Sequence, residues 1–159
     1  MEISLKILKK LYQDLGINPE IGDLPKRLVL QKTAFLAKYA GAPISHNFNW
    51  YVKGPYSPSL ASSYYELQDY LEEDVEDLSF DEDVRDRIAS LKEVIHKKNS
   101  NNSVNPDWVE ALASIAFLVN DSKKTIEEAI QILAVKKSHI ETDMVQEAIA
   151  ELEKISYLH

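Results

Sequence analysis

Residues 28–40 have the sequence LVLQKTAFLAKYA, and their apolar side chains cover most of the circumference of a helix. The polar remainder is a narrow stripe formed by Arg27, Gln31 and Lys38. A helix that is apolar on nearly all sides belongs in the interior of a domain. This stretch therefore predicts a central helix with one thin polar face that is exposed to solvent.

A second segment, residues 105–119, has the same character and leaves little but Glu110 and Ser114 polar. We expect the first central helix to begin at an N-cap, Asp23, and to end before Gly41. Two segments of this kind need each other to bury their surfaces. We therefore predict two central helices that pack on each other.

Five more helices are predicted from apolar residues that recur every three or four positions. Their first residues are typical capping residues: Ser57 before Pro58, Asp81, Thr125 in a capping box, and Thr142. The expected fold is mainly α, or α+β at most, with about seven helices around the two central ones. The five outer helices are expected near residues 5–15, 57–71, 81–95, 125–137 and 142–155.

The length of 159 residues and the hydrophobic content of 45% predict one domain, residues 1–159. The segment Asn99–Asn102 and the following Ser103 form the most polar break in the chain. Asparagine and serine clusters favour loops. We predict a flexible loop at residues 99–103, open to proteolysis, rather than a domain boundary.

One short strand is predicted before the third helix, because Phe48, Trp50 and Val52 alternate with polar or aromatic neighbours. A lone strand would leave its backbone groups unpaired. The best partner is the brief alternation Leu78-Ser79-Phe80. We therefore predict a small antiparallel β pair between these two segments.

The charge of the chain argues against general nucleic-acid binding. The net charge is −8 and the isoelectric point is near 5.0, so most of the surface repels phosphates. Two small lysine sets remain, and ordinary solvated helix faces are their favoured interpretation. The sets are Lys6, Lys9 and Lys10, and Lys123, Lys124, Lys136 and Lys137.

Signals for a location are few. The sequence has no apolar run of about 18 residues and no pattern of a signal peptide. It contains no cysteine, which fits a reducing compartment. We expect a cytoplasmic protein.

No motif for catalysis, cofactor binding or metal binding is recognisable, so we predict no catalytic, cofactor or metal residues. The four histidines, His46, His96, His139 and His159, have no metal-ligand spacing, and no glycine-rich phosphate loop occurs. Carboxylates are dense between residues 66 and 86. A dense exposed run stays ionised, so a solvated or partner-facing surface is favoured over an active site.

The most unusual stretch is the aromatic corner Trp50-Tyr51-Val52-Lys53-Gly54-Pro55-Tyr56-Ser57-Pro58. Gly54 permits a positive φ and Pro55 fixes the next residue, so the chain can reverse sharply into the third helix. Tyr56 then either tucks back over Trp50 and the central helix or points outward as a rigid contact. The tucked arrangement is favoured.

These residues resemble a known family. The sequence is similar to the SocA-type antitoxins, also called the Panacea family, and most of all to its YwgA-type members. The similarity is carried by Leu30-Gln31-Lys32 on a helix, the strand and turn from Phe48 to Ser57, and then Leu60 and Tyr64. The resemblance implies a helical domain with a small β element and no known catalytic residues. It also implies an antitoxin or an adaptor, with a toxin or a protease component as partner.

The preferred hypothesis is a protein-interaction module without enzymatic activity. Two alternatives remain. One is a DNA-associated regulator that uses the terminal helical hairpin or the first helix, in which a dimer would gather two basic patches. The other is an enzyme with His46, or an acidic residue near the loop, as its acid–base group. The residues predicted to bind the partner are Arg27, Gln31, Lys38, Trp50, Tyr51, Lys53, Gly54, Pro55, Tyr56 and Tyr64.

Overall fold

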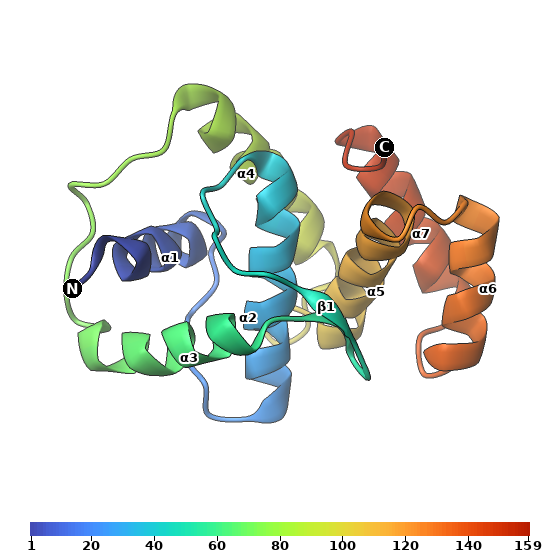
Figure 1. The fold of residues 1–159 in the computed structure, drawn as a ribbon, viewed down its shortest axis with the longest axis horizontal. Helices are drawn as coiled ribbons and strands as arrows, with labels where there is room; N and C mark the ends of the chain where they lie inside the picture. Colours follow the sequence, from blue (N-terminus) through green and yellow to red (C-terminus); the bar gives the residue numbers. More distant parts are fainter.

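The two apolar segments form helices α2 (Leu24–Ala37) and α5 (Pro106–Ala116), which lie side by side in the middle of the molecule (Figure 1). The computed structural model describes residues 1–159. Leu30 and Phe35 of α2 and Leu112 of α5 are fully buried or nearly so. The prediction of two central helices packed on each other is confirmed.

The remaining helices cover the two central ones from opposite sides (Figure 1). Three of them pack around α2: α1 (Ile3–Asp14), α3 (Pro58–Leu67) and α4 (Glu82–Ile95). Two pack on α5: α6 (Ile126–Lys136) and α7 (Thr142–Lys154). The predicted fold, mainly α with seven helices and one small sheet, is confirmed.

Short irregular turns extend four of the helices. Three are single 3₁₀ turns and one is a π-helical turn that continues α5. They are Lys38–Ala40, Gln68–Tyr70, His96–Lys98 and Phe117–Asp121, in the order η1 to η4.

Capping side chains begin most of these helices where the sequence predicts. Asp23 accepts a hydrogen bond from the Lys26 amide at 2.9 Å, and Ser57 accepts one from the Leu60 amide at 3.2 Å. Thr125 forms the expected capping box. The prediction for α7 is wrong by one residue: Glu141 occupies the N-cap without a side-chain bond, and Thr142 is the first helical residue.

The small sheet is a tight hairpin, and its predicted partner strand is wrong. Strand β1 (Asn49–Tyr51) pairs antiparallel with β2 (Gly54–Tyr56), joined by Val52 and Lys53. Leu78-Ser79-Phe80 forms no strand. A two-residue turn places the second strand next to the first at little entropic cost, whereas a distant segment would have to close a long loop.

The polar segment at residues 99–103 contains a tight turn. Ser100 and Ser103 exchange two backbone hydrogen bonds, of 2.9 and 3.0 Å. Asn101 and Asn102 between them have positive φ angles of 53° and 61°, a conformation that asparagine tolerates better than most residues. The flexibility expected of this loop remains a prediction.

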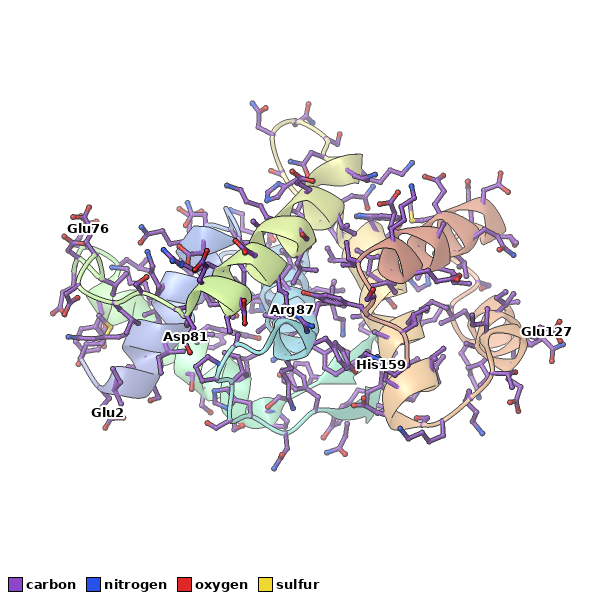
Figure 2. The ribbon with its side chains drawn as sticks, turned by 90° about the horizontal axis from the view of Figure 1, so that it is seen from above. Glu2, Glu76, Asp81, Arg87, Glu127 and His159 are labelled. Carbon is purple, nitrogen blue, oxygen red and sulfur yellow. The ribbon has the colours of Figure 1, made fainter.

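Charged groups lie toward both ends of the molecule, while the C-terminus folds back on its middle. Figure 2 shows Glu2, Glu76 and Asp81 toward one end and Glu127 at the other. His159 lies nearer the middle, where its amide donates to the Asn120 side chain at 2.8 Å.

The acidic run between residues 66 and 86 is exposed, as the favoured interpretation requires. None of the helices combines the length and the apolar character that a membrane crossing demands.

Gly54 is the glycine that the fold can least replace. Its φ is +90°, and a Cβ atom built there would lie 2.7 Å from Ser114 Oγ. We predict that Gly54→Ala lowers the free energy of unfolding by about 1–3 kcal/mol, because both the backbone and the contact are strained. Urea unfolding followed by circular dichroism measures this change.

Gly22→Ala is the matched control. Gly22 has no positive φ, and the nearest atom to an added Cβ is Lys26 Nζ at 3.8 Å. Its stability should stay equal to wild type or rise by up to about 1 kcal/mol. Equal losses in the two variants would contradict the close approach of the hairpin to helix α5.

Candidate functional site

Two polar side chains of helix α2 hold the hairpin to the core. Gln31 Oε1 accepts from the Ser57 amide at 2.9 Å, and Gln31 Nε2 donates to the Ser57 carbonyl at 2.9 Å. Lys32 Nζ donates to the Pro55 carbonyl at 2.6 Å. Both side chains are 1% exposed. We call these four residues, Gln31, Lys32, Pro55 and Ser57, the latch.

The latch gives a physical reason for the sequence motif. The Leu30-Gln31-Lys32 and Gly54–Ser57 segments lie more than twenty positions apart, yet their side-chain and backbone groups bond directly to each other. Gln31 therefore does not belong to an exposed polar stripe, and that prediction is wrong. A glutamine amide that satisfies both the N–H and the C=O of one residue imitates a strand partner.

A buried charge cluster lies beneath the hairpin, where α2 meets α5. Glu110 Oε2 lies 3.3 Å from Lys137 Nζ, and the two side chains are 1% and 2% exposed. Glu110 Oε1 lies 3.1 Å from His139 Nε2. Lys137 Nζ also lies 5.4 Å from the centroid of the Trp50 ring, at the base of the hairpin. We define the buried charge cluster as Lys32, Glu110 and Lys137.

Basic groups outnumber acidic groups in this cluster. Burial lowers the pKa of Lys32 to about 7, while Glu110 acts against that change and Lys137 and Lys53 add to it. Burial also lowers the pKa of Lys137, again opposed by Glu110. One carboxylate faces two buried amines and an exposed third, so the region is short of negative charge.

A groove opens beside the hairpin, between helices α2 and α3. Its volume is about 160 Å³. Apolar and aromatic side chains form most of its wall: Leu24, Leu28, Tyr56, Tyr64 and Tyr65. The polar side chains that line it are Arg27, Gln31, Lys32 and Lys53. We refer to it below as the groove.

The groove brings together half of the predicted binding residues. Arg27, Lys53 and Tyr56 line it, as do Gln31 and Tyr64 from its buried side. Arg27 is half-buried, with one guanidinium nitrogen bonded to the Ile21 carbonyl at 2.8 Å. The remaining five residues lie elsewhere in or around the hairpin.

Lys38 and Trp50 lie away from the groove. Lys38 Nζ donates to the His46 carbonyl at 3.2 Å and lies 5.3 Å from the centroid of the Phe48 ring. Trp50 packs on Phe117, with ring centroids 5.7 Å apart. These contacts tie Trp50 to the core side of the hairpin, so its ring braces the hairpin.

The hairpin itself has a buried base and an exposed tip. Gly54 and Pro55 are buried, Tyr56 is half-buried, and Tyr51 and Val52 are exposed. The Tyr56 ring meets Tyr51 edge to face at 5.3 Å. The expectation that Tyr56 tucks over Trp50 is wrong, because Tyr56 packs on Tyr51 while Trp50 packs on Phe117. Tyr56 does lie beside the central helix α2, where it lines the groove with Leu28.

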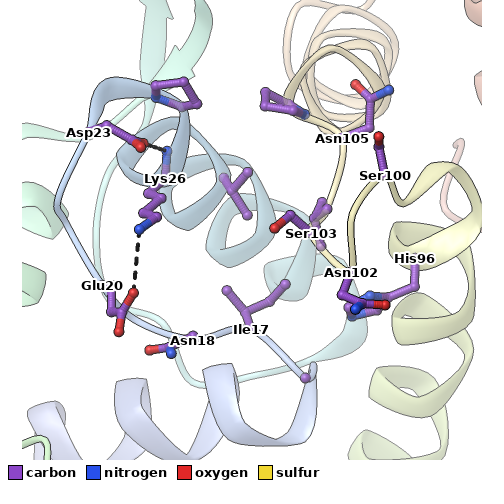
Figure 3. Close-up of a pocket in the computed structure, with 15 residues that line it drawn as sticks. Ile17, Asn18, Glu20, Asp23, Lys26, His96, Ser100, Asn102, Ser103 and Asn105 are labelled. Carbon is purple, nitrogen blue, oxygen red and sulfur yellow. Dashed lines mark hydrogen bonds and ion pairs between the residues drawn. The ribbon is translucent and has the colours of Figure 1, made fainter.

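A larger concavity of about 600 Å³ lies on the far side of α2, at the N-termini of α2 and α5 (Figure 3). Several of its polar side chains are bonded within the fold. Asp23 caps α2, and Lys26 Nζ lies 3.5 Å from Glu20. His96 Nε2 bonds to the Leu15 carbonyl at 2.8 Å. The side chains of Asn18, Ser100, Asn102 and Ser103 make no hydrogen bond within the fold and remain free for a ligand.

Two other polar sets carry less promise as sites. His46 bonds to Ser59 at 2.8 Å and to Ser63 at 3.3 Å, and it lines neither concavity.

Asp107, Glu110 and His139 offer ligand atoms within 4.8 Å of one another, which is close enough to hold a metal ion. The Lys137 ammonium beside Glu110, however, repels a cation at that place.

The two lysine sets differ in solvation: Lys123, Lys124 and Lys136 are exposed, as predicted, whereas other members bond within the fold. Lys137 is buried against Glu110, so its assignment to a solvated helix face is wrong. Lys9 Nζ donates to the Tyr70 and Leu71 carbonyls at 2.8 and 2.9 Å. Lys10 pairs with Asp14 at 3.2 Å. Lysines that bond within the fold offer fewer free charges to a phosphate backbone.

The buried charge cluster was not predicted from the sequence. The sequence analysis named Lys32 only as part of the family resemblance, and Glu110 only as one of the few polar residues in its helix. The available signal was one lysine and one glutamate in the middle of two helices that are otherwise apolar. Charged residues at such positions must be paired or bonded when buried.

Comparisons with known proteins give no match: no family model, no curated protein and no solved structure is similar to this chain.

The depressed pKa of Lys32 predicts a pH-dependent stability. Between pH 7 and 10.5 the unfolded chain carries the proton on Lys32 and the folded chain does not, so stability rises with pH by up to about 1.4 kcal/mol per unit. Lys32→Met should lose this slope. Urea unfolding at three pH values within that window measures the difference between wild type and variant.

Lys26→Met, an exposed lysine on the same helix, serves as the control. Its unfolding free energy should follow that of wild type at every pH. If the Lys32→Met variant also runs parallel to wild type, Lys32 stays charged in the folded protein and the pKa assignment fails.

Proposed function

We propose that this protein is a non-enzymatic protein-interaction module whose binding surface is the hairpin tip together with the groove. The resemblance of its motif to SocA-type antitoxins supports this class, and with it an antitoxin-like or adaptor-like role. The proposed partner is another protein, such as a toxin or a protease component, and the proposed setting is the cytoplasm.

The observation that carries this proposal is the gathering of exposed apolar side chains at one place. Val52 is 86% exposed, Leu24 57%, Tyr65 51% and Tyr51 45%. Leu24 and Tyr65 line the groove, and Val52 adjoins Lys53 at its rim. Exposed aromatic and aliphatic anchors that cluster in this way are typical of binding surfaces.

The rigidity of the hairpin also supports the proposal. The latch fixes Pro55 and Ser57 from below, and the Trp50 ring is braced by Phe117. A surface that is already held in its binding conformation loses little entropy when a partner docks. The latch then serves binding by ordering the tip before the partner arrives.

Val52→Asp tests the tip. We expect this variant to keep the thermal midpoint within about 2 °C of wild type, because surface substitutions usually change stability little. It should lose the partner, because a carboxylate at the centre of an apolar contact must be desolvated. Affinity capture from lysate of the native host measures the loss. Two separate variants, with a photo-crosslinking residue at position 52 or at position 135, identify which proteins contact each place.

Val135→Asp is the matched control. Val135 lies on α6, does not line the groove, and is 77% exposed. Crosslinks from position 52 to one defined protein, absent from position 135, are the expected result. Capture of the same proteins by wild type, Val52→Asp and Val135→Asp would contradict the proposal.

A further inference from the structure

The groove has room for about one residue of a partner. Its volume of about 160 Å³ is close to that of a cavity that holds a single benzene molecule, about 150 Å³. A helix or an extended strand laid on a surface needs a longer trough with several side-chain pockets. The occupant that fits is one side chain with the backbone atoms next to it.

Two cations, Arg27 and Lys53, line the groove, and no carboxylate does. Lys32 also lines it, but burial lowers the pKa of its amine to about 7. Lys53 is exposed and has no ion-pair partner within the fold. The whole chain carries a net charge of −8, so this is a local excess of positive charge on an acidic protein. Such a site attracts an anionic group and rejects a cationic one.

The Tyr64 hydroxyl adds a neutral donor at the same place. It accepts a hydrogen bond from Gln31 Nε2 at 3.4 Å, and no acceptor in the fold takes its own hydrogen. Burial raises the pKa of Tyr64, which keeps the hydroxyl protonated at neutral pH. A carboxylate oxygen that enters the groove would satisfy this donor.

The last residue of a polypeptide offers a carboxylate and a side chain on the same Cα atom. We infer that the groove binds the C-terminal residue of a partner protein. The carboxylate lies among Arg27, Lys53 and the Tyr64 hydroxyl, and an apolar side chain packs on Leu28 and Tyr56. An internal Asp or Glu offers a carboxylate but no separate apolar side chain on the same Cα atom, so it would leave the apolar wall at Leu28 and Tyr56 without a contact. The inference rests on the proposed function and adds the part of the partner that is recognised.

Fluorescence anisotropy with labelled synthetic peptides of about ten residues tests this directly, using the full chain. The peptides share a glycine–serine lead and end in leucine, valine, phenylalanine or tyrosine, each made with a free carboxylate and as the amide. We expect at least one free acid to bind at least about tenfold more tightly than its amide, because charge-assisted hydrogen bonds are lost in the amide. Equal affinity of every acid and amide, or no binding by any peptide, overturns the inference.

Protein variants locate the binding. Lys53→Glu should weaken the binding of the free acid by at least about tenfold, because it places a like charge at the rim. Lys26→Glu is the control, since Lys26 is the neighbour of Arg27 in sequence but lines the other concavity. A similar loss in both variants would mean general electrostatic attraction and would overturn the assignment to the groove.

The inference and the proposed function can fail separately. A partner that crosslinks to position 52 and is not displaced by the free-acid peptides leaves the proposed function intact and removes the C-terminal residue as its recognition element. If position 52 crosslinks to no defined protein and the chain still binds the free acids more tightly than the amides, the proposed function fails and the recognition of a C-terminal residue by the groove stands.

Discussion

The structure depends on a buried amine, Lys32, that donates to the backbone of a hairpin. Its side chain is 1% exposed, and its bond to the Pro55 carbonyl is 2.6 Å long. Removing an amine from water costs several kcal/mol unless bonds and nearby charge compensate it. Here the compensation comes from Pro55 and from Glu110 on the facing helix. Lys32 thus binds the hairpin to the core, and the hairpin in turn supplies the acceptor that allows Lys32 to be buried.

Several features of the site follow from this constraint. The hairpin must approach α5 closely, so only glycine fits at position 54. Gln31 fixes Ser57, and Ser57 in turn caps α3, so one glutamine sets both the end of the hairpin and the start of the next helix. The groove between them has walls that are already in place. Arg27 and Lys53 line the groove without any carboxylate, which gives the groove its preference for an anion.

The sequence predicted the helices well because their signals are local: apolar spacing, caps such as Asp23 and Thr125, and breaks at glycine and proline. It failed for the strand partner, because the turn Val52-Lys53 lacks the asparagine–glycine pair of common hairpins. It also failed for Gln31 and Lys137, which look like surface residues until distant backbone or charge reaches them. Burial of a polar side chain depends on its tertiary partners, and no local pattern carries that information.

The most direct measurement of the central claim is the hydrogen-exchange rate of the Ser57 amide. This amide donates its hydrogen bond to the buried side chain of Gln31. If the latch holds the hairpin to α2, this amide should exchange as slowly as the central amides of α2, through global unfolding alone, and Gln31→Leu should speed it while α7 stays unchanged. Exchange of the Ser57 amide in wild type at the rate of an open loop would contradict the account.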